Sequence, residues 1–123
     1  MLTEKFFEVI SKEGVVSIVS WSDGDAHVVN TWNSYLVIKD KDRILIPAYA
    51  MHKTEKNILK NNKVKLTLGS KEVMGLQYQG AGFLIDGIAK YIESGKEYDE
   101  MKSKFSFLTR VLEIKVISVK QTL

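Results

Sequence analysis

Two stretches of the chain bring together side chains that could bind a polar ligand. The first spans residues 27–36 and reads His-Val-Val-Asn-Thr-Trp-Asn-Ser-Tyr-Leu. A half-buried strand usually alternates apolar and polar residues, whereas here amide and hydroxyl groups surround two aromatic rings, Trp32 and Tyr35. Aromatic surface next to groups such as those of Asn30 and Thr31 suits a flat ligand with polar edges. The alternative is an ordinary sheet strand with a solvated polar face.

The second stretch spans residues 47–57 and reads Pro-Ala-Tyr-Ala-Met-His-Lys-Thr-Glu-Lys-Asn. It follows the apolar run 44–46, which is typical of a strand that leads into a helix. A helix start offers free backbone N–H groups and the positive end of the helix dipole. His52, Lys53 and Thr54 would add an imidazole, a positive charge and a hydroxyl there, so we predict a phosphate site. The alternative is that Thr54 only caps the helix and Lys53 is a solvated lysine.

Several classes of site are excluded by what the sequence lacks. The chain contains neither G-x-G-x-x-G nor G-x-x-x-x-G-K-[ST], which argues against a dinucleotide-binding Rossmann domain and a P-loop. It has no cysteine, which removes disulfides, thiolate catalysis and cysteine-bound clusters. His27 and His52 lack the spacing of a metal motif, so no metal site is expected. No residue stands out as a catalytic acid or base.

Length and composition indicate one globular domain covering residues 1–123, with 45% hydrophobic and 27% charged residues. No signal peptide or run of 18 apolar residues appears, so we expect a cytoplasmic protein without a membrane segment. The formal charge of +3 raises the question of nucleic acid. The lysines, however, alternate with acidic residues and the two arginines, Arg43 and Arg110, are far apart, so nucleic acid stays a minor alternative.

Hydrophobic periodicity and turn residues predict short helices and six strands. A helix begins after Thr3 and ends before Gly14, and two more helices cover 53–61 and the stretch around 98–105. The predicted strands span 15–21, 26–39, 43–47, 63–68, 83–92 and 110–119. Residues 69–82 are predicted to form a loop, and Gly87 predicts a bulge or a bend inside its strand.

Strands joined as hairpins cannot form a parallel doubly wound sheet, because that sheet needs a helix between successive strands. We therefore predict a mainly β protein, a small antiparallel barrel with short α-helices. Several apolar residues are expected to be exposed, which favours their burial against a second copy of the chain. These residues are Met74, Leu76, Phe107 and Leu123. The alternative is that they are ordinary core residues or isolated apolar residues on the surface.

The whole chain also resembles a known family. The segments that carry the resemblance are Phe-Phe-Glu-Val-Ile at 6–10, Glu-Gly-Val-Val at 13–16, Val-Asn-Thr-Trp-Asn-Ser-Tyr-Leu at 29–36, Met-His-Lys-Thr-Glu at 51–55, Thr-Leu-Gly-Ser at 67–70, Gly-Phe-Leu-Ile at 82–85 and Gln-Thr-Leu at 121–123. Together they resemble the pyridoxamine-phosphate-oxidase-like split-barrel flavoproteins, and among these the small FMN-binding proteins of sulfate-reducing bacteria. The resemblance is specific because the segments at 29–36 and 51–55 both match, and they stand at the same separation along the chain as in the family.

The resemblance implies a six-stranded antiparallel split β-barrel of Greek-key type that forms a homodimer and holds FMN non-covalently near the interface. It also implies the contacts of each part of FMN. The ribityl-phosphate side would meet Asn30, Thr31, His52, Lys53 and Thr54, and the isoalloxazine would lie beside Trp32 and Tyr35. The backbone of Pro47, Ala48, Tyr49 and Met51 would follow the polar edge of the ring, and Phe107 and Leu123 would approach from the partner subunit.

Two positions depart from the family pattern. Phe107 stands where a tryptophan is expected, which should remove one aromatic quencher of flavin emission. Tyr49 and Ala50 replace a pair of glycines and place more bulk beside the ring.

FMN would perform redox chemistry while the protein positions it. We expect a small flavoprotein that passes electrons or hydride to an unidentified redox partner. The alternatives are an FMN-dependent oxidase or an NAD(P)H-flavin reductase, a nucleic-acid-binding small barrel, and an interaction module without a cofactor.

Overall fold

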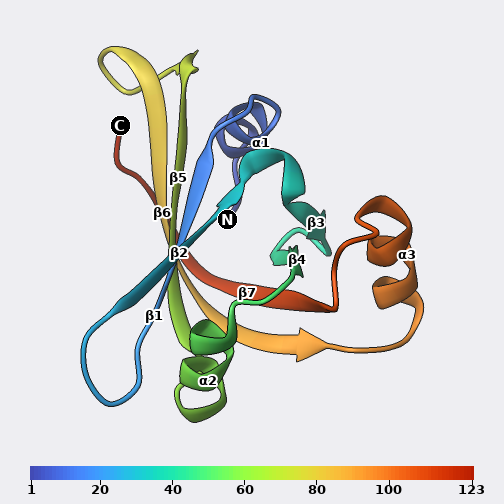
Figure 1. Cartoon of the computed structure of the whole chain (residues 1–123). Helices are drawn as coiled ribbons and strands as arrows, with labels where there is room; N and C mark the ends of the chain where they lie inside the picture. Colours follow the sequence, from blue (N-terminus) through green and yellow to red (C-terminus); the bar gives the residue numbers. More distant parts are fainter.

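The computed structural model describes every residue from Met1 to Leu123. Its elements follow one another along the chain as shown in Figure 1. They are α1 (Glu4–Ile10), β1 (Val15–Ser20), β2 (His27–Trp32), a 3-10 turn (Asn33–Tyr35), β3 (Val37–Lys39), β4 (Arg43–Ala48), α2 (His52–Lys60), β5 (Lys63–Met74), β6 (Gln79–Ile92), α3 (Lys96–Lys104) and β7 (Arg110–Gln121).

The strands form one sheet in the order β2-β1-β5-β6-β7-β4-β3, and every neighbouring pair is antiparallel. The three long strands β5, β6 and β7 lie in the middle of this order, and the short strands flank them. Side chains from both ends of the order meet in one core of 20 buried residues, which includes Val16 and Ile18 of β1 as well as Ile44 and Ile46 of β4. The sheet is therefore bent around a common apolar core, as predicted for a small barrel.

Helices α1 and α3 each pack against buried apolar residues of the sheet. Thr3 caps α1 through a hydrogen bond from the Phe6 N–H to its side-chain oxygen (3.3 Å), as predicted, and Phe6 and Val9 of α1 are buried in the core. Helix α3 packs through Met101 on a smaller cluster that contains Leu45 of β4. No helix has the length and apolar content to span a bilayer.

The structure has seven strands, so the prediction of six was wrong. The predicted strand at 26–39 is interrupted by the 3-10 turn, in which the Leu36 N–H donates to the Asn33 carbonyl (3.2 Å). The pairing of β2 with β1 therefore ends at Trp32, and the residues after the turn form the separate strand β3, which pairs with β4.

The predicted loop at 69–82 was also wrong, because β5 runs on to Met74 and β6 begins at Gln79. A turn closed by the Gly75 N–H and the Tyr78 carbonyl (2.8 Å) joins them. The glycines of this region allow two backbones to approach, since a Cβ on Gly69 would lie 2.7 Å from the Ala81 carbonyl oxygen. The predicted bulge is confirmed, because the pairing of β6 with β7 shifts register between Asp86 and Gly87.

Gly14 lies directly before β1 at a place that has no room for a side chain, so we can predict the effect of one added methyl group. A Cβ at this position would lie 2.5 Å from the Gly69 carbonyl oxygen and 2.8 Å from Nδ2 of the buried Asn33. We expect Gly14→Ala to lower the free energy of unfolding by about 1–3 kcal/mol, the usual cost of overpacking. Urea unfolding measures it, with Gly24→Ala as the control because a Cβ on Gly24 meets nothing within 4 Å. Equal losses in both variants would contradict this packing.

Candidate functional site

The start of α2 presents a row of backbone donors without acceptors in the protein. Between β4 and α2 the N–H groups of Tyr49, Ala50 and Met51 donate to no protein group. Met51 is the N-cap residue and makes no side-chain capping bond. The N–H groups of the first helical turn, residues 52–54, have no acceptor within the helix. Consecutive free donors at the positive end of a helix dipole favour an anion or a carbonyl-rich ligand.

Thr54 adds an independent indication of a ligand at this point. Its side chain is 0% exposed, yet its Oγ1 has no hydrogen-bond partner. A buried hydroxyl without a partner costs about 1–3 kcal/mol, and the alternative that Thr54 merely caps α2 is wrong because Met51 holds the cap position. His52 and Lys53 next to it are exposed and make no ion pair within the chain. An anionic group bound here would satisfy Thr54 and face a free lysine.

Strand β2 packs beside α2. Its side chains alternate, so Thr31 points into the protein and is buried, while Asn30 and Trp32 point outward. Asn30 accepts a hydrogen bond from the Ser17 hydroxyl of β1 (3.2 Å). Trp32 is 45% exposed in the single chain, which leaves one side of the indole free for a ligand or a second subunit.

The 3-10 turn after β2 sets the direction of Tyr35. The Asn33 side chain anchors the turn by donating from Nδ2 to the carbonyls of Lys12 (3.0 Å) and Gly69 (3.2 Å). Ser34 donates from its hydroxyl to Glu13 (2.8 Å), and this bond lowers the pKa of the Glu13 carboxyl. Tyr35 was predicted to lie on a strand, and the structure places it on this anchored turn instead.

Tyr35 belongs to an aromatic cluster with Phe105 and Phe107, the residues that follow α3. The ring centroids of Tyr35 lie 5.3 Å from Phe105 and 5.6 Å from Phe107. Phe107 therefore packs against Tyr35 of its own chain.

An ion-pair network holds α3, and with it this aromatic cluster. Arg43 of β4 donates through two nitrogens to both carboxylate oxygens of Glu97 in α3 (2.8 and 2.6 Å). It also pairs with the buried Glu113 of β7. The hydrogen bond from Arg43 is the main reason that the pKa of Glu97 is lowered. The planar guanidinium suits this bidentate geometry better than a lysine would.

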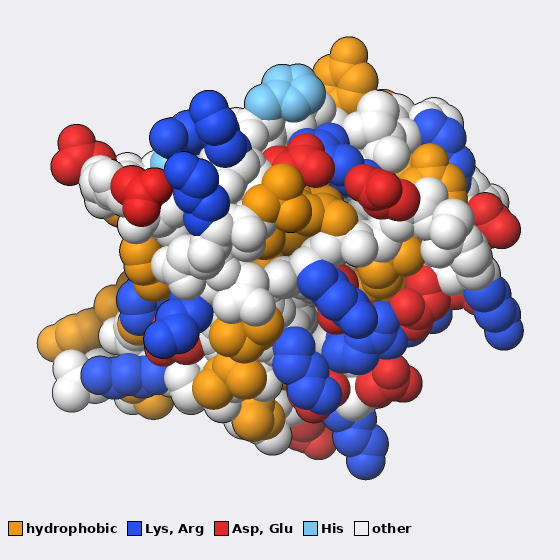
Figure 2. All heavy atoms as spheres, turned by 90° about the horizontal axis from the view of Figure 1, so that it is seen from below, with side chains coloured by type: hydrophobic (Ala, Val, Ile, Leu, Met, Phe, Trp, Pro, Cys, Tyr) orange, Lys and Arg blue, Asp and Glu red, His pale blue; other side chains and the backbone are white.

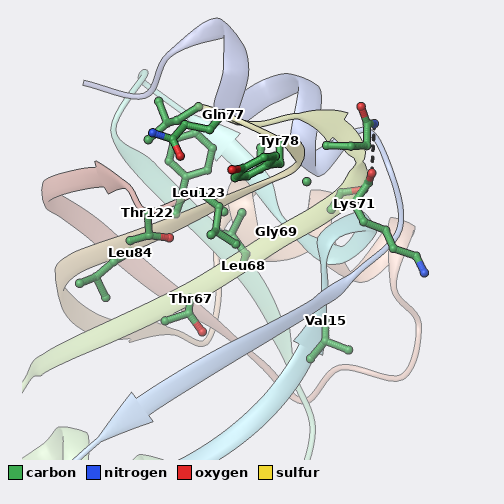
Figure 3. A pocket seen from close by; sticks show the side chains of 17 residues that line it. Val15, Thr67, Leu68, Gly69, Lys71, Gln77, Tyr78, Leu84, Thr122 and Leu123 are labelled. Carbon is green, nitrogen blue, oxygen red and sulfur yellow. Dashed lines mark hydrogen bonds between the residues drawn. The ribbon is translucent and has the colours of Figure 1, made fainter.

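Leu123 lies in a different place. It lines an open groove of about 1010 Å³ at the outer end of β5 and β6. Figure 3 shows Gln77, Tyr78 and Leu123 together at one end of the groove, with Val15 and Thr67 at the other. Val15 pairs with Trp32, so the groove approaches the exposed indole along β1. Within one chain Leu123 and α2 belong to separate parts of the structure (Figure 1).

A buried cluster behind the Tyr49–Met51 loop was not predicted. Arg110 of β7 donates from Nη2 to the Ala50 carbonyl (2.5 Å), pairs with Glu55 of α2 (2.9 Å) and lies over the Tyr91 ring (5.3 Å to the centroid). The Tyr91 hydroxyl is buried without a partner, and desolvation raises its pKa to about 12. A signal was available, because only two of the 18 basic residues of this chain are arginines and Arg110 is one of them.

The loop that Arg110 contacts is strained. Ala50 and Met51 both have left-handed backbone angles, with φ of 57° and 53°. Non-glycine residues adopt this conformation at a cost of about 1–2 kcal/mol each. The glycine expected from the family pattern at position 50 would adopt it without strain, whereas Tyr49, the other position where glycine is expected, has no left-handed angle. Pro47 and Ala48 before the loop are buried at the end of β4, and Tyr49 is exposed.

The site thus joins β2, the loop, the start of α2 and the aromatic cluster. No group of three or more metal-ligating side chains occurs in the chain. Figure 2, which views the protein from the side of α2, shows lysines and acidic residues intermixed around apolar patches. The donor set of hydroxyls, free N–H groups and one exposed lysine fits a phosphate, and the aromatic side chains fit a flat ring.

Comparison with known proteins adds independent information. The family model for pyridoxamine 5'-phosphate oxidase matches residues 2–123. An "FMN-binding protein" from Nitratidesulfovibrio vulgaris (strain DSM 19637 / Miyazaki F) is 44% identical over 123 residues, 100% of both chains.

Solved structures show the same fold at low sequence identity. HupZ of Group A Streptococcus superposes with a TM-score of 0.82 at 16% identity, covering 99% of this chain and 94% of that one. An FMN-binding protein from Syntrophomonas wolfei subsp. wolfei gives a TM-score of 0.73 at 14% identity, covering 88% and 76%. The predicted mainly β, antiparallel split-barrel fold is therefore confirmed, with seven strands in place of six. With a family model that spans nearly its entire length and a relative of 44% identity, the chain belongs to the pyridoxamine 5'-phosphate oxidase family.

Proposed function

We propose that this protein binds FMN non-covalently and acts as a small redox protein that passes electrons or hydride to a partner. The observation that carries the proposal is the buried, unpartnered hydroxyl of Thr54 in the uncapped first turn of α2, beside the free Lys53. The 44% identical relative is named for FMN binding, which supports the same ligand here.

In this proposal each part of FMN contacts a different set of residues. Lys53, Thr54 and the free N–H groups of α2 bind the phosphate, and Asn30, Thr31 and His52 bind the ribityl-phosphate side. The loop from Pro47 to Met51 supplies backbone donors to the polar edge of the ring. Trp32 and Tyr35 cover the ring, with Phe105 and Phe107 supporting Tyr35 from behind.

Redox transfer is favoured over acid-base catalysis by the composition of the site. FMN supplies one- and two-electron chemistry when bound. The proposed contact residues include a single imidazole, that of His52, and no carboxylate side chain, so the chain is equipped to bind and orient rather than to move protons. The family model's own description favours an oxidase as the second candidate. Turnover with NAD(P)H or a phosphorylated amine would favour an enzyme over the proposed carrier.

We further propose that the protein is a homodimer and that the groove at the end of β5 and β6 lies in the interface. Several apolar side chains at this groove are exposed in the single chain, among them Leu76, Tyr78 (79% exposed) and Leu123 (64% exposed). A surface of this kind favours burial against another subunit. Leu123 of one subunit would then approach the ring bound next to Trp32 of the other.

Trp32→Phe tests whether the flavin ring lies beside Trp32. We expect free FMN to lose its emission when it binds the wild-type protein, because the indole of Trp32 donates an electron to the excited ring and Tyr35 acts as a weaker second donor. Bound FMN should be markedly brighter in Trp32→Phe. A phenyl ring keeps most of the packing, so the dissociation constant should rise only about fivefold, or about 1 kcal/mol. Fluorescence titration of FMN measures both quantities.

Trp21→Phe is the matched control. Trp21 follows β1, and its carbonyl accepts from the Asn61 side chain (3.1 Å). The residue lines a separate small groove with Val64 and Ile117, away from the proposed ring site. Equal brightening in the two variants, or no brightening in Trp32→Phe while FMN stays bound, would show that the ring lies elsewhere. A protein that leaves FMN emission and polarisation unchanged would contradict the proposed function itself.

A further inference from the structure

The loop between β4 and α2 does not adopt its shape through its own backbone preferences. Ala50 and Met51 follow one another with φ of 57° and 53°, a conformation that L-residues seldom adopt. The N–H groups of both residues are free, so no hydrogen bond donated by the loop stabilises the conformation. Something outside the loop must hold it.

Arg110 provides the main external contact. Its Nη2 donates to the Ala50 carbonyl (2.5 Å) and pairs with Glu55 Oε1 in the first turn of α2 (2.9 Å). Its Nη1 donates to the hydroxyl of Thr109 (3.0 Å), whose N–H donates in turn to the Ala48 carbonyl (2.9 Å). One guanidinium therefore links both ends of the loop, and its side chain is only 8% exposed.

The contact between Arg110 and the Ala50 carbonyl also determines the direction of the free N–H group of Met51. The peptide group is planar and trans, so its N–H points opposite to its C=O. Because the Ala50 carbonyl is turned inward onto Arg110, the N–H of Met51 is turned away from it, into the space in front of α2. A lysine could not reproduce this, since a single ammonium lacks the fork that reaches a carbonyl and a carboxylate in fixed directions.

We infer that Arg110 is a positioning residue for the flavin: by holding the left-handed Ala50–Met51 turn, it presents the loop's free N–H groups to the polar edge of the bound ring. The inference rests on the proposed function, because it assigns a role toward the same ligand. It adds a residue that contacts no ligand but sets both the affinity and the electronic environment of the ring, since donors along the ring edge tune its spectrum and potential.

The test compares Arg110→Lys with Arg43→Lys, the same substitution at the only other arginine of the chain. Arg43 is also largely buried and forms a comparable fork, but it ties α3 to β4 and β7. For Arg110→Lys we expect FMN binding to weaken about tenfold, because FMN must then itself impose the left-handed turn that Arg110 otherwise holds, together with a shift of the visible flavin bands and of the reduction potential. For Arg43→Lys, which loosens α3 and the aromatic cluster behind Tyr35 but not the loop, we expect a lower melting temperature, a smaller loss of FMN affinity than for Arg110→Lys and unchanged bands.

A second test of the role of Arg110 uses the variant Ala50→Gly. Glycine adopts φ near 57° without strain, so the loop should depend less on Arg110, and Arg110→Lys should weaken FMN binding by clearly less than tenfold in the Ala50→Gly background. If Arg110→Lys alone does not fold, Ala50→Gly/Arg110→Lys is compared with Ala50→Gly/Arg43→Lys: a band shift or affinity loss confined to the Arg110 variant, smaller than tenfold, supports the inference, and identical bands and affinity overturn it.

The outcomes separate the two proposals. Wild-type protein that binds FMN, with Arg110→Lys indistinguishable from Arg43→Lys in affinity and bands, would overturn the role of Arg110 and leave the proposed function standing. Wild-type protein that takes up no FMN would overturn the proposed function and this inference with it.

Discussion

Replacing Lys53 by alanine is expected to weaken FMN binding roughly tenfold to a hundredfold while leaving riboflavin binding unchanged. The exposed ammonium makes no ion pair in the chain and stands in the uncapped first turn of α2. A charge-assisted hydrogen bond to phosphate contributes about 1.5–3 kcal/mol, and each 1.4 kcal/mol is a factor of about ten in affinity. Riboflavin lacks the phosphate, so its dissociation constant isolates the contribution of the ring and ribityl chain. Titrations of dialysed protein with both ligands give the comparison.

Lys60→Ala is the matched control for this experiment. Lys60 lies in the last turn of the same helix and pairs with Asp23 (3.0 Å) on the exposed surface. We expect no change in FMN affinity for this variant. An unchanged FMN dissociation constant in Lys53→Ala would remove Lys53 from the site, and an equal loss for FMN and riboflavin would mean that Lys53 acts through the fold rather than through the phosphate.

Removal of residues 121–123 is expected to weaken the dimer by about thirtyfold to a thousandfold. In a two-fold symmetric interface every lost contact is counted twice. Burying the exposed part of each Leu123 contributes about 1–2 kcal/mol, which amounts to about 2–4 kcal/mol for the dimer. The truncated chain also loses the hydrogen bond from the Thr122 N–H to the Gly82 carbonyl (2.8 Å), which fixes the chain end against β6. FMN should bind more weakly as the second subunit leaves.

Sedimentation velocity over a range of micromolar concentrations measures this effect. Leu59→Ala serves as control, because Leu59 is an exposed leucine of α2 outside the groove. A wild-type protein that sediments as a monomer with FMN fully bound would contradict the proposed interface, and so would a truncated protein that dimerises as tightly as the wild type.

Features determined by nearby residues were predictable from the sequence. The cap at Thr3, the hairpin between β1 and β2 and the irregularity at Gly87 all follow from local signals. The segment that begins α2 was also identified correctly, because an apolar strand followed by polar helix formers marks such a junction. The hairpin order of the strands predicted a small antiparallel barrel, and the family resemblance then added the split-barrel type and the expectation of FMN.

Features determined by distant residues were not predictable. The extension of β5 and β6 has little alternation because part of it projects beyond the core, so it resembled a loop. The turn at Tyr35 depends on Asn33, whose amide is held by carbonyls far along the chain. Arg110 escaped notice for the same reason, since its partner Ala50 is 60 positions away. In each case the decisive contact exists only after the chain has folded.

The visible absorption spectrum of the purified, dialysed protein tests the central claim most directly. We expect flavin bands that persist through dialysis and that correspond to one FMN for each chain. Heating should remove the bands and release FMN, which its mass identifies. A colourless protein that also fails to acquire these bands when FMN is added would contradict the assignment of the phosphate site at α2 and of the ring site beside Trp32.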